Sequence, residues 1–256
     1  MAKPVLQKNI QGWIETRNAL KKSGASIGFV PTMGALHAGH ASLLERCRKE
    51  NDISVLSIYV NPTQFNNPED LKKYPSTLDH DREIAEKAGV DHILLPTYEQ
   101  MYPDHYRYKV TERELSERLC GAHRPGHFDG VLTVVMKLLN LVRADRAYFG
   151  EKDFQQLQLV MGMADAFFLE TAIVPCTIVR EADGLAMSSR NVNLSRAARE
   201  KSPLIYKTLR ESASALAARA QLEKAGFIVD YVEDIGSRRF AAATLDNVRL
   251  IDNVEK

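Results

Sequence analysis

The chain has 256 residues, enough for one large domain or two of ordinary size, and its 45% apolar and 26% charged residues are typical of a soluble globular protein. The 34 Lys and Arg residues balance 33 Asp and Glu residues, which leaves a net charge of +1. No global field therefore attracts a phosphate backbone, and nucleic acid is not expected as a partner. Any anion must be bound by local groups.

The termini and cysteines indicate the compartment. The first fifteen residues lack the charged start and apolar stretch of a signal peptide. The longest apolar stretch, residues 131–142, is too short to cross a bilayer and contains Lys137. Cys47, Cys120 and Cys176 show no C-x-x-C or Cys/His ligand spacing, which favours free thiols. We expect a cytoplasmic protein without a membrane segment.

Short apolar runs alternate with helical patterns through the first 180 residues. Such runs, typical of parallel strands covered on both faces, predict strands at 27–31, 53–62, 91–96, 146–150 and 171–179. Helical spacing of apolar residues predicts helices between them, among others at 10–24, 38–50 and 131–144. This order indicates an α/β fold with a doubly wound parallel sheet, whose ligands bind at the carboxyl ends of the strands.

The pattern changes after Arg190. A helix-rich segment, 195–227, precedes predicted strands at 227–235 and 248–254, which indicates a smaller C-terminal α+β domain. The polar, glycine-containing segment 181–195 is the expected boundary. We predict domains at 1–182 and 183–256.

The sequence FVPTMGALHAGH, residues 29–40, combines a strand end with a tight turn. Val30 ends the first predicted strand, and Gly34 allows the chain to turn quickly into the next helix. The free amides at that helix start, with the positive end of the helix dipole, form a site for phosphate.

Two histidines three residues apart, His37 and His40, lie in the first turn of this predicted helix. For an isolated H-x-x-H, one capping and one packing histidine is the commoner interpretation. A metal site is weaker still, because no third Cys, His or carboxylate follows at ligand spacing. The coincidence of glycine turn, strand end and helix start favours phosphate binding here.

Two other loops leave predicted strands at the same edge of the sheet. VNPTQF carries Asn61 and Gln64, which should face the ligand bound at this edge, although each alone could be a turn or surface residue. YFGEKDFQQ ends a strand and offers Lys152, Asp153 and Gln156 at a helix start. A lysine there opposes the helix dipole, which a bound polyphosphate would explain, although a single lysine is more commonly solvated.

Two polar segments complete the candidate residues. DGLAMSSRN places Ser188, Ser189 and Arg190 in a loop that could close over a bound phosphate ligand or simply cap the following helix. RPGHFDG contains Arg124, which could bind a carboxylate or phosphate.

Five motifs in chain order carry a family resemblance: PTMGALHAGH, VNPTQF, RPGHFDGVLTVV, YFGEKDFQQ and AMSSRN. Together they resemble the pantothenate synthetase (pantoate-β-alanine ligase) family. H-x-G-H itself resembles the HIGH motif of a nucleotidyltransferase superfamily that attacks the α-phosphate of a nucleoside triphosphate. The resemblance runs from about Val30 to Asn193, with an echo in DYVE and RLIDN near the C-terminus.

This resemblance implies a two-step reaction. Pantoate attacks ATP to give pantoyl adenylate and pyrophosphate, and β-alanine then displaces AMP. It also implies Mg²⁺ bound through the ATP phosphates, near Asp153, rather than at a protein metal site. The first domain would bind nucleotide and pantoate and form a homodimer, and the second would act as a lid.

The resemblance also carries residue roles onto matching positions. The catalytic set would be His37, His40, Lys152, Ser188, Ser189 and Arg190, with His40 the usual proton donor. The ATP-binding set would be Met33, Gly34, Ala35, Leu36, His37, Ala38, Gly39, His40, Gly150, Glu151, Lys152, Asp153, Val179, Met187, Ser188, Ser189 and Arg190. Pantoate and β-alanine would contact Gln64, Gln156, Asn61 and Arg124.

The chain departs from the family pattern in two places. Ser76 stands where members often have arginine, and the C-terminal region is expected to be shorter than usual. One rival hypothesis is another superfamily enzyme that joins CMP or AMP to a phosphorylated alcohol, which would need cations rather than glutamines around its second substrate. A non-catalytic nucleotide sensor or RNA-binding module is opposed by the near-zero net charge and the absence of RNA-binding signatures.

Overall fold

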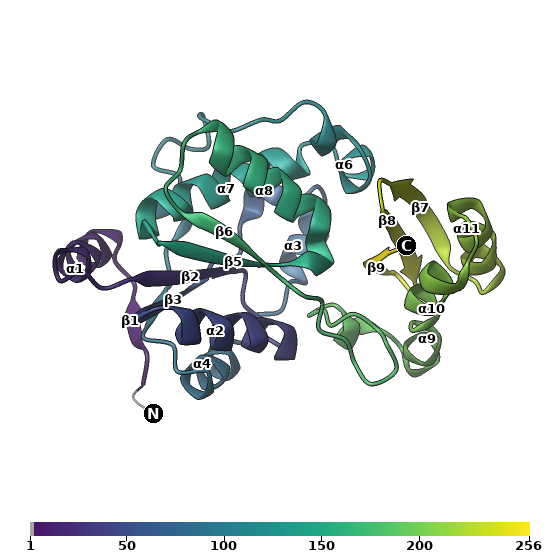
Figure 1. Ribbon diagram of the computed structural model, residues 1–256, viewed down its shortest axis with the longest axis horizontal. Helices are drawn as coiled ribbons and strands as arrows, with labels where there is room; N and C mark the ends of the chain where they lie inside the picture. Colours follow the sequence, from purple (N-terminus) through teal and green to yellow (C-terminus); the bar gives the residue numbers. More distant parts are fainter. Residues whose placement is uncertain (1–2) are drawn as a thin grey trace.

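The computed structural model describes residues 3–256 and contains two sheets (Figure 1). The larger sheet has six parallel strands in the order β1-β4-β3-β2-β5-β6. Its strands are β1 Val5–Gln7, β2 Ile27–Thr32, β3 Ile53–Ile58, β4 His92–Leu94, β5 Arg146–Gly150 and β6 Ala172–Cys176. The predicted doubly wound α/β fold is confirmed.

Helices cover both faces of this sheet (Figure 1). Phe29 of β2 and Val55 of β3 are buried in a cluster with Trp13 and the long helix α7, whereas Val30 and Leu56 are buried with helices α2 and α4 on the opposite face. This alternation follows from the two-residue period of a strand. The helices of this part are α1 Ile10–Lys22, α2 Ala38–Glu50, α3 Pro68–Lys72, α4 Leu78–Lys87, α5 Tyr98–Met101, α6 Cys120–His123, α7 His127–Val142 and α8 Phe154–Ala166, with short 3₁₀ turns η1 Pro62–Gln64, η2 Leu115–Glu117 and η3 Glu151–Asp153.

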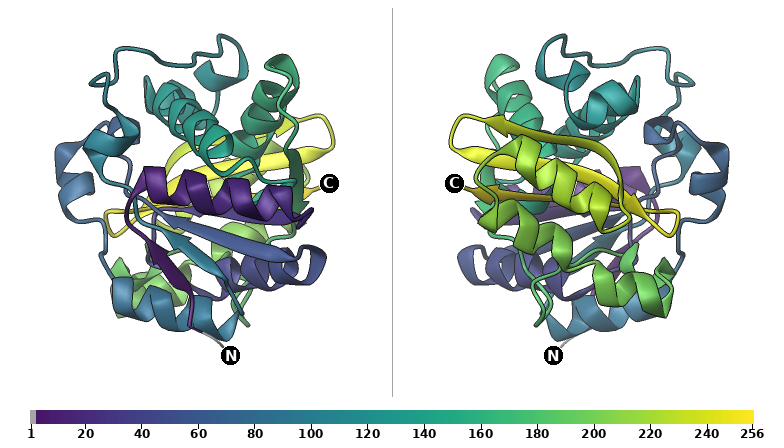
Figure 2. Two further views of the ribbon diagram at one scale, coloured as in Figure 1. Left: turned by 90° about the vertical axis from the view of Figure 1, so that its left-hand side faces the viewer. Right: turned by 90° about the vertical axis from the view of Figure 1, so that its right-hand side faces the viewer.

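The second sheet is antiparallel, in the order β7-β8-β9. Its outer face is covered by the C-terminal helices, as the right-hand view of Figure 2 shows. Its inner face contributes Phe240 and Ala242 to the same cluster as α7, while Ala241 and Ala243 pack with the C-terminal helices. These elements are the 3₁₀ turn η4 Asn191–Asn193, helices α9 Arg196–Lys201, α10 Leu204–Glu211 and α11 Ala215–Lys224, and strands β7 Ile228–Ile235, β8 Arg238–Leu245 and β9 Val248–Glu255.

Several predicted strand limits were wrong. The strand expected at 53–62 ends at Ile58, and the one expected at 171–179 ends at Cys176. Pro175 is tolerated within β6 because this strand lies at the sheet edge, where a missing amide need not break a ladder. Strands β1 and β8 were not predicted. β1 has only three residues, and β8 is rich in alanine, a weak strand former.

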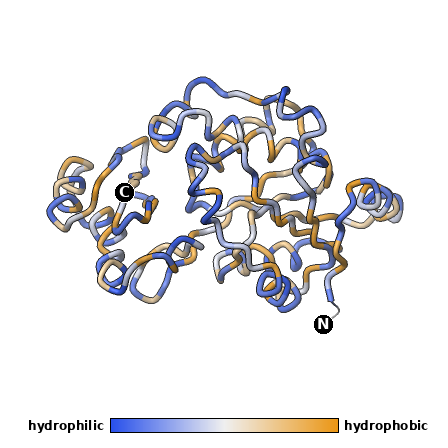
Figure 3. Tube along the Cα trace, turned by 180° about the vertical axis from the view of Figure 1, so that it is seen from behind, coloured by the Kyte–Doolittle hydropathy of each residue, from blue (hydrophilic) through white to orange (hydrophobic). Residues whose placement is uncertain are grey.

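The hydropathy of the chain follows this layering. In Figure 3 the trace is predominantly hydrophobic along the central strands and hydrophilic over many connecting loops. None of the helices between residues 3 and 256 is long and apolar enough to cross a membrane.

A buried carboxylate joins helix α4 to the turn that follows β2. Asp81 is 1% exposed and accepts hydrogen bonds from the backbone amides of Ala35 (3.0 Å) and Leu36 (2.8 Å). Thr77 Oγ1 donates a third bond to the same carboxylate, at 3.1 Å. Gly34 and Ala35 both have left-handed backbone angles, with φ of 83° and 51°, a strained choice for alanine. The carboxylate therefore holds the turn in a conformation that Ala35 alone would disfavour.

We expect Asp81→Asn to lower the free energy of unfolding by about 1–3 kcal/mol, because an amide group would turn a donor toward a buried backbone donor. Asp79→Asn is the matched control, since the Asp79 side chain on the same helix is 97% exposed. The control should change stability by less than about 0.5 kcal/mol. Equal stability of the two variants in urea titrations would contradict the role given to Asp81.

Candidate active site

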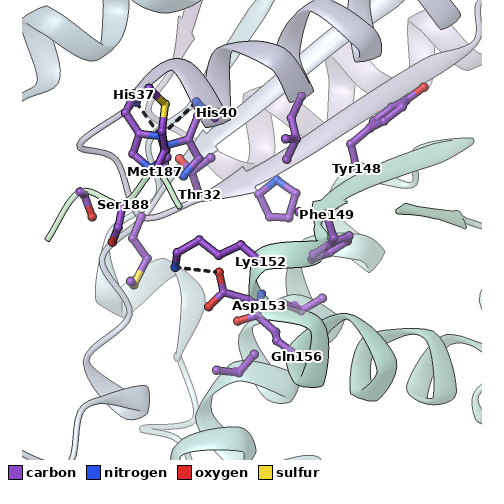
Figure 4. A pocket seen from close by; sticks show the side chains of 18 of the residues that line it. Thr32, His37, His40, Tyr148, Phe149, Lys152, Asp153, Gln156, Met187 and Ser188 are labelled. Carbon is purple, nitrogen blue, oxygen red and sulfur yellow. Dashed lines mark hydrogen bonds and ion pairs between the residues drawn. The ribbon is translucent and has the colours of Figure 1, made fainter. Parts of the chain in front are cut away.

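A cavity of about 250 Å³ lies at the carboxyl ends of β2, β3 and β5, as expected for a parallel sheet. Two strand-to-helix corners, after β2 and after β5, form opposite parts of its wall (Figure 4). The segment 177–190, which leads toward the C-terminal sheet, provides a further part. Residues from these three separate parts of the sequence thus line one cavity with polar groups in its wall.

The first corner begins at Thr32, the last residue of β2. Its hydroxyl donates to the carbonyl of Ser57 at 2.7 Å and accepts from the amide of Gly34 at 3.1 Å, which connects β2, β3 and the turn. Asp81 holds the next two amides from behind. Because all these groups are fixed before any ligand arrives, helix α2 starts at a defined position beside the cavity.

His37 and His40 form a reciprocal capping box at the start of α2. Nδ1 of His37 accepts from the amide of Gly39 at 3.1 Å, and Nδ1 of His40 accepts from the amide of His37 at 3.3 Å. The ring centroids are 4.1 Å apart. Since Nδ1 is an acceptor in both rings, the neutral imidazoles carry their protons on Nε2. Capping therefore fixes the tautomers and leaves one donor on each ring, so the cap and ligand-binding interpretations are compatible.

Both imidazoles are neutral near pH 7. Burial, reinforced by the positive charge of Lys152, lowers the pKa of His37 to about 4. Burial, followed by His37 and Lys152, lowers the pKa of His40 to about 3. A neutral imidazole can donate from Nε2 without placing a second buried cation beside Lys152.

The second corner follows β5. Gly150 ends the strand, and the 3₁₀ turn η3 carries Lys152 and Asp153 into the cavity wall. Figure 4 shows the Lys152 side chain reaching toward the part of the cavity formed by Ser188 and the histidines. Lys152 Nζ lies 3.6 Å from the Asp153 carboxylate. Burial opposes ionisation of Asp153, but the charges of Lys152 and Arg190 outweigh it and keep the pKa of this carboxyl below its usual value.

The loop at 187–190 lies between the two corners. The Met187 amide donates to the carbonyl of Val179 at 3.0 Å, and the Arg190 amide donates to the hydroxyl of Ser188 at 3.2 Å. Ser189 also lines the cavity. The loop thus brings two hydroxyls and a guanidinium to the wall beside His37.

Gln64 and Gln156 line the cavity from η1 and α8. The amide of Asn61, which is 1% exposed, donates to Oε1 of Gln64 at 3.1 Å and to the carbonyl of Gly130 at 3.1 Å. Its oxygen accepts from Thr63 Oγ1 at 3.0 Å and from Tyr102 OH at 2.9 Å. All the hydrogen-bonding capacity of Asn61 is therefore used within the protein, which orients Gln64.

Arg124 lies behind the cavity. Its guanidinium contacts Nε2 of His127 at 3.1 Å and donates to the carbonyl of Gln64 at 3.3 Å. Burial, followed by the charges of Arg190 and Arg249, lowers the pKa of Arg124 to about 10. The expected direct contact of Arg124 with substrate is not supported by this placement, since it supports the backbone of Gln64 instead.

The cavity unites most of the predicted residues. Those that line it are Met33, His37, Gly39, His40, Asn61, Gln64, Gly150, Lys152, Asp153, Gln156, Val179, Met187, Ser188, Ser189 and Arg190. Those that do not are Gly34, Ala35, Leu36, Ala38, Glu151 and Arg124. Gly34 to Leu36 form the turn behind the first corner, held there by Asp81.

Sequence reasoning missed several residues that line the cavity, among them Tyr74, Thr32 and Thr177. Tyr74 lines the cavity, packs edge-on against Phe65 at 5.9 Å, and has its pKa raised by burial. Thr32 and Thr177 also line it. Their only sequence signal was their position near motif or strand ends, which is weak. Ser76, by contrast, is exposed.

The residues from 3 to 256 contain no group of three or more His, Cys, Asp or Glu side chains that could hold a metal ion. Asp153 is the carboxylate that lines the cavity. One carboxylate together with substrate phosphates is a common way to bind Mg²⁺, so Asp153 is compatible with that ion.

Comparisons with known proteins agree with this geometry. A family model described as pantoate-beta-alanine ligase matches residues 6–255. A pantothenate synthetase from Bdellovibrio bacteriovorus is 60% identical over 235 residues, 92% of this chain and 94% of that protein. One from Legionella pneumophila (strain Corby) is 50% identical and covers 96% of this chain and 97% of that protein. The match thus extends over nearly the whole length of both relatives.

Solved structures give the same result. A pantoate-beta-alanine ligase from Francisella tularensis, complexed with beta-gamma ATP and beta-alanine, is 39% identical with a TM-score of 0.94, covering 98% of this chain and 97% of that one. A pantothenate synthetase from Thermus thermophilus is 40% identical with a TM-score of 0.90, covering 98% of this chain and 99% of that one. The chain belongs to the pantoate-β-alanine ligase family.

Proposed function

We propose that the cavity between the two corners binds ATP and pantoate and carries the reaction through a pantoyl adenylate. Family membership makes the protein an ATP-dependent ligase that condenses pantoate with β-alanine. The observation that carries the detailed proposal is the placement of neutral donors, a lysine and two glutamines around one cavity. In support, the Francisella relative is described in complex with beta-gamma ATP and beta-alanine.

In the first step, a carboxylate oxygen of pantoate attacks the α-phosphorus of ATP, and the bond to the bridging oxygen breaks to release pyrophosphate. Negative charge builds on the phosphoryl oxygens. His37, His40, Lys152, Ser188, Ser189 and Arg190 are the proposed donors to these oxygens. By analogy with an oxyanion donor, each contributes about 2.7–4 kcal/mol to stabilising the transition state.

Pantoate would lie at the inner end of the cavity. Gln64 and Gln156 are neutral, so they can orient its hydroxyls and carboxylate without neutralising the nucleophile. Val134, Val135 and Leu138 of α7 also line the cavity and offer an apolar wall for the two methyl groups of pantoate. We assign Asn61 and Arg124 to holding Gln64 rather than to substrate contact.

In the second step, the amine nitrogen of β-alanine attacks the acyl carbon, the bond from that carbon to the AMP oxygen breaks, and the nitrogen loses a proton. Gln64 is the proposed contact of this second substrate. Five predicted ATP-binding residues would contribute only by setting the backbone conformation of the two corners. They are Gly34, Ala35, Leu36, Ala38 and Glu151.

Asp153 is the proposed residue for holding Mg²⁺ that arrives with ATP. The ion, when bound, neutralises charge on the phosphates. Lys152, 3.6 Å from the same carboxylate, orients Asp153 and offers its ammonium to the phosphates.

The remaining predictions concern the whole molecule. A cytoplasmic location is supported by three free buried cysteines, typical of a reducing compartment. A homodimer is supported by the open edge at β6 and by Phe168, 92% exposed just before it. The boundary at 182/183, with residues 183–256 as a lid, stays a prediction.

We expect His40→Ala to reduce pantoate-dependent exchange of labelled pyrophosphate into ATP by about 100-fold or more, since it removes one oxyanion donor. The exchange, measured without β-alanine, reports the first step alone. His80→Ala, on the exposed surface of α4, is the matched control and should exchange at the normal rate. Near-normal exchange by His40→Ala would reject its role, and no exchange by the unaltered protein would reject the adenylate.

We expect His37→Asn to make the fold less sensitive to acid. The pKa of this side chain is about 4 when folded and about 6.5 when unfolded, so between these values the unfolded chain binds more protons. The stabilising contribution is present above pH 6.5 and is lost as the pH falls toward 4. Asparagine keeps the helix cap but does not titrate. Urea titrations at pH 7 and pH 5 should therefore show a smaller loss of stability for the variant, and an unchanged loss would contradict the assigned burial.

A further inference from the structure

One side chain of the C-terminal sheet binds the backbone of the corner that carries Lys152. Asn253 of β9 is 2% exposed, and its amide nitrogen donates to the carbonyl of Glu151 at 2.9 Å and to the carbonyl of Lys152 at 3.1 Å. These carbonyls belong to the two peptide groups that flank the α-carbon of Lys152. Fixing both peptide planes fixes the direction in which the lysine side chain leaves the backbone.

The orientation of this amide is set from the other side. Oδ1 of Asn253 accepts from the Arg238 guanidinium at 2.6 Å. The same guanidinium lies over the ring of Phe154, 4.1 Å from its centroid, and Phe154 is the first residue of α8. Arg238 therefore makes a second contact with the corner, at Phe154. Because it binds Oδ1 of Asn253, the side-chain nitrogen of Asn253 faces the two carbonyls.

A buried ion pair holds the backbone of Asn253. The backbone N–H of Asn253 donates to Asp252 Oδ1 at 2.8 Å. The guanidinium of Arg180 binds both oxygens of that carboxylate, at 2.7 and 2.9 Å. Arg180 follows Val179, which lines the cavity, and its guanidinium lies 3.7 Å from the centroid of the Tyr206 ring. The network thus runs from the segment after β6, which contains Val179 and Arg180, through β9 to the turn that carries Lys152.

We propose that Asn253 is a positioning residue for adenylation. It orients the Lys152 side chain toward the phosphates, and it makes this orientation depend on the position of the C-terminal sheet. The inference rests on the proposed function, because Lys152 is its route of action. Asn253 does not line the cavity that holds the histidines and Lys152. Its effect on the chemistry must therefore pass through the corner.

The test compares two half-reactions of the full-length protein. Asn253→Asp has nearly the same shape and keeps the contact with Arg238, but it turns an oxygen toward the two carbonyls. We expect pantoate-dependent pyrophosphate exchange to fall by at least about 10-fold in kcat. Aminolysis of supplied pantoyl adenylate by β-alanine should slow by much less, because the β- and γ-phosphates that Lys152 would also bind are absent.

Glu255→Gln is the matched control on the same strand. Glu255 bonds Arg238 from the exposed end of β9, and glutamine retains an acceptor there. Both half-reactions should be unchanged in this variant. Asn253→Ala provides a second variant should the aspartate disturb folding, and unfolding curves for all variants show that the folded state is being assayed.

A double variant separates positioning from general support. In a Lys152→Ala background, Asn253→Asp should reduce pyrophosphate exchange by less than about 2-fold, because the side chain that Asn253 orients is already absent. Equal slowing of both half-reactions, or full additivity with Lys152→Ala, would overturn the proposal in favour of a structural role. Normal exchange by Asn253→Asp would also overturn it. Absence of exchange in the unaltered protein would instead reject the adenylate proposal.

Discussion

The site depends on one buried carboxylate that holds a left-handed turn. Gly34 and Ala35 both have positive φ, and Ala35 would not adopt this conformation without compensation. Asp81 supplies that compensation through two backbone amides. Because the turn is fixed, helix α2 begins beside the cavity, and its first turn can be capped by imidazoles in place of the usual hydroxyl and carboxylate. Each imidazole then has a defined tautomer and one free donor.

The neutrality of these imidazoles follows from the same arrangement. Burial disfavours a charged ring, and Lys152 across the cavity disfavours it further. The two cations of the cavity wall, Lys152 and Arg190, are therefore accompanied by neutral imidazoles rather than by two more charges. A triphosphate can be bound by such a mixture without complete neutralisation of the attacking carboxylate. The same logic explains amides, rather than cations, at Gln64 and Gln156.

Sequence reasoning succeeded where local pattern and tertiary role coincide. The strand-turn-helix at residues 27–50 and the corner at Gly150 were predictable, because glycine, strand ends and helix starts each leave a local signal. Asp81 left none, since a first-turn aspartate is ordinary in any helix and its partners are 45 and 46 residues away. Arg124 and Asn61 were predicted to contact substrate, and in the structure both bind Gln64. Their contacts with Gln64 could not be predicted, because backbone carbonyls and substrate oxygens attract the same donors.

The C-terminal sheet is joined to the corner that carries Lys152 by specific side-chain contacts. Asn253 uses both amide protons on carbonyls of η3, and Arg238 stacks on the first residue of α8. Each contact joins β8 or β9 to the backbone that carries Lys152, and none requires substrate. A displacement of this sheet would remove two hydrogen bonds from the peptide groups beside the lysine, leaving their carbonyls to solvent. The position of the sheet and the direction in which Lys152 leaves the backbone are therefore coupled through these contacts. Under the role proposed for Lys152, the seated sheet orders the cation that binds the phosphates.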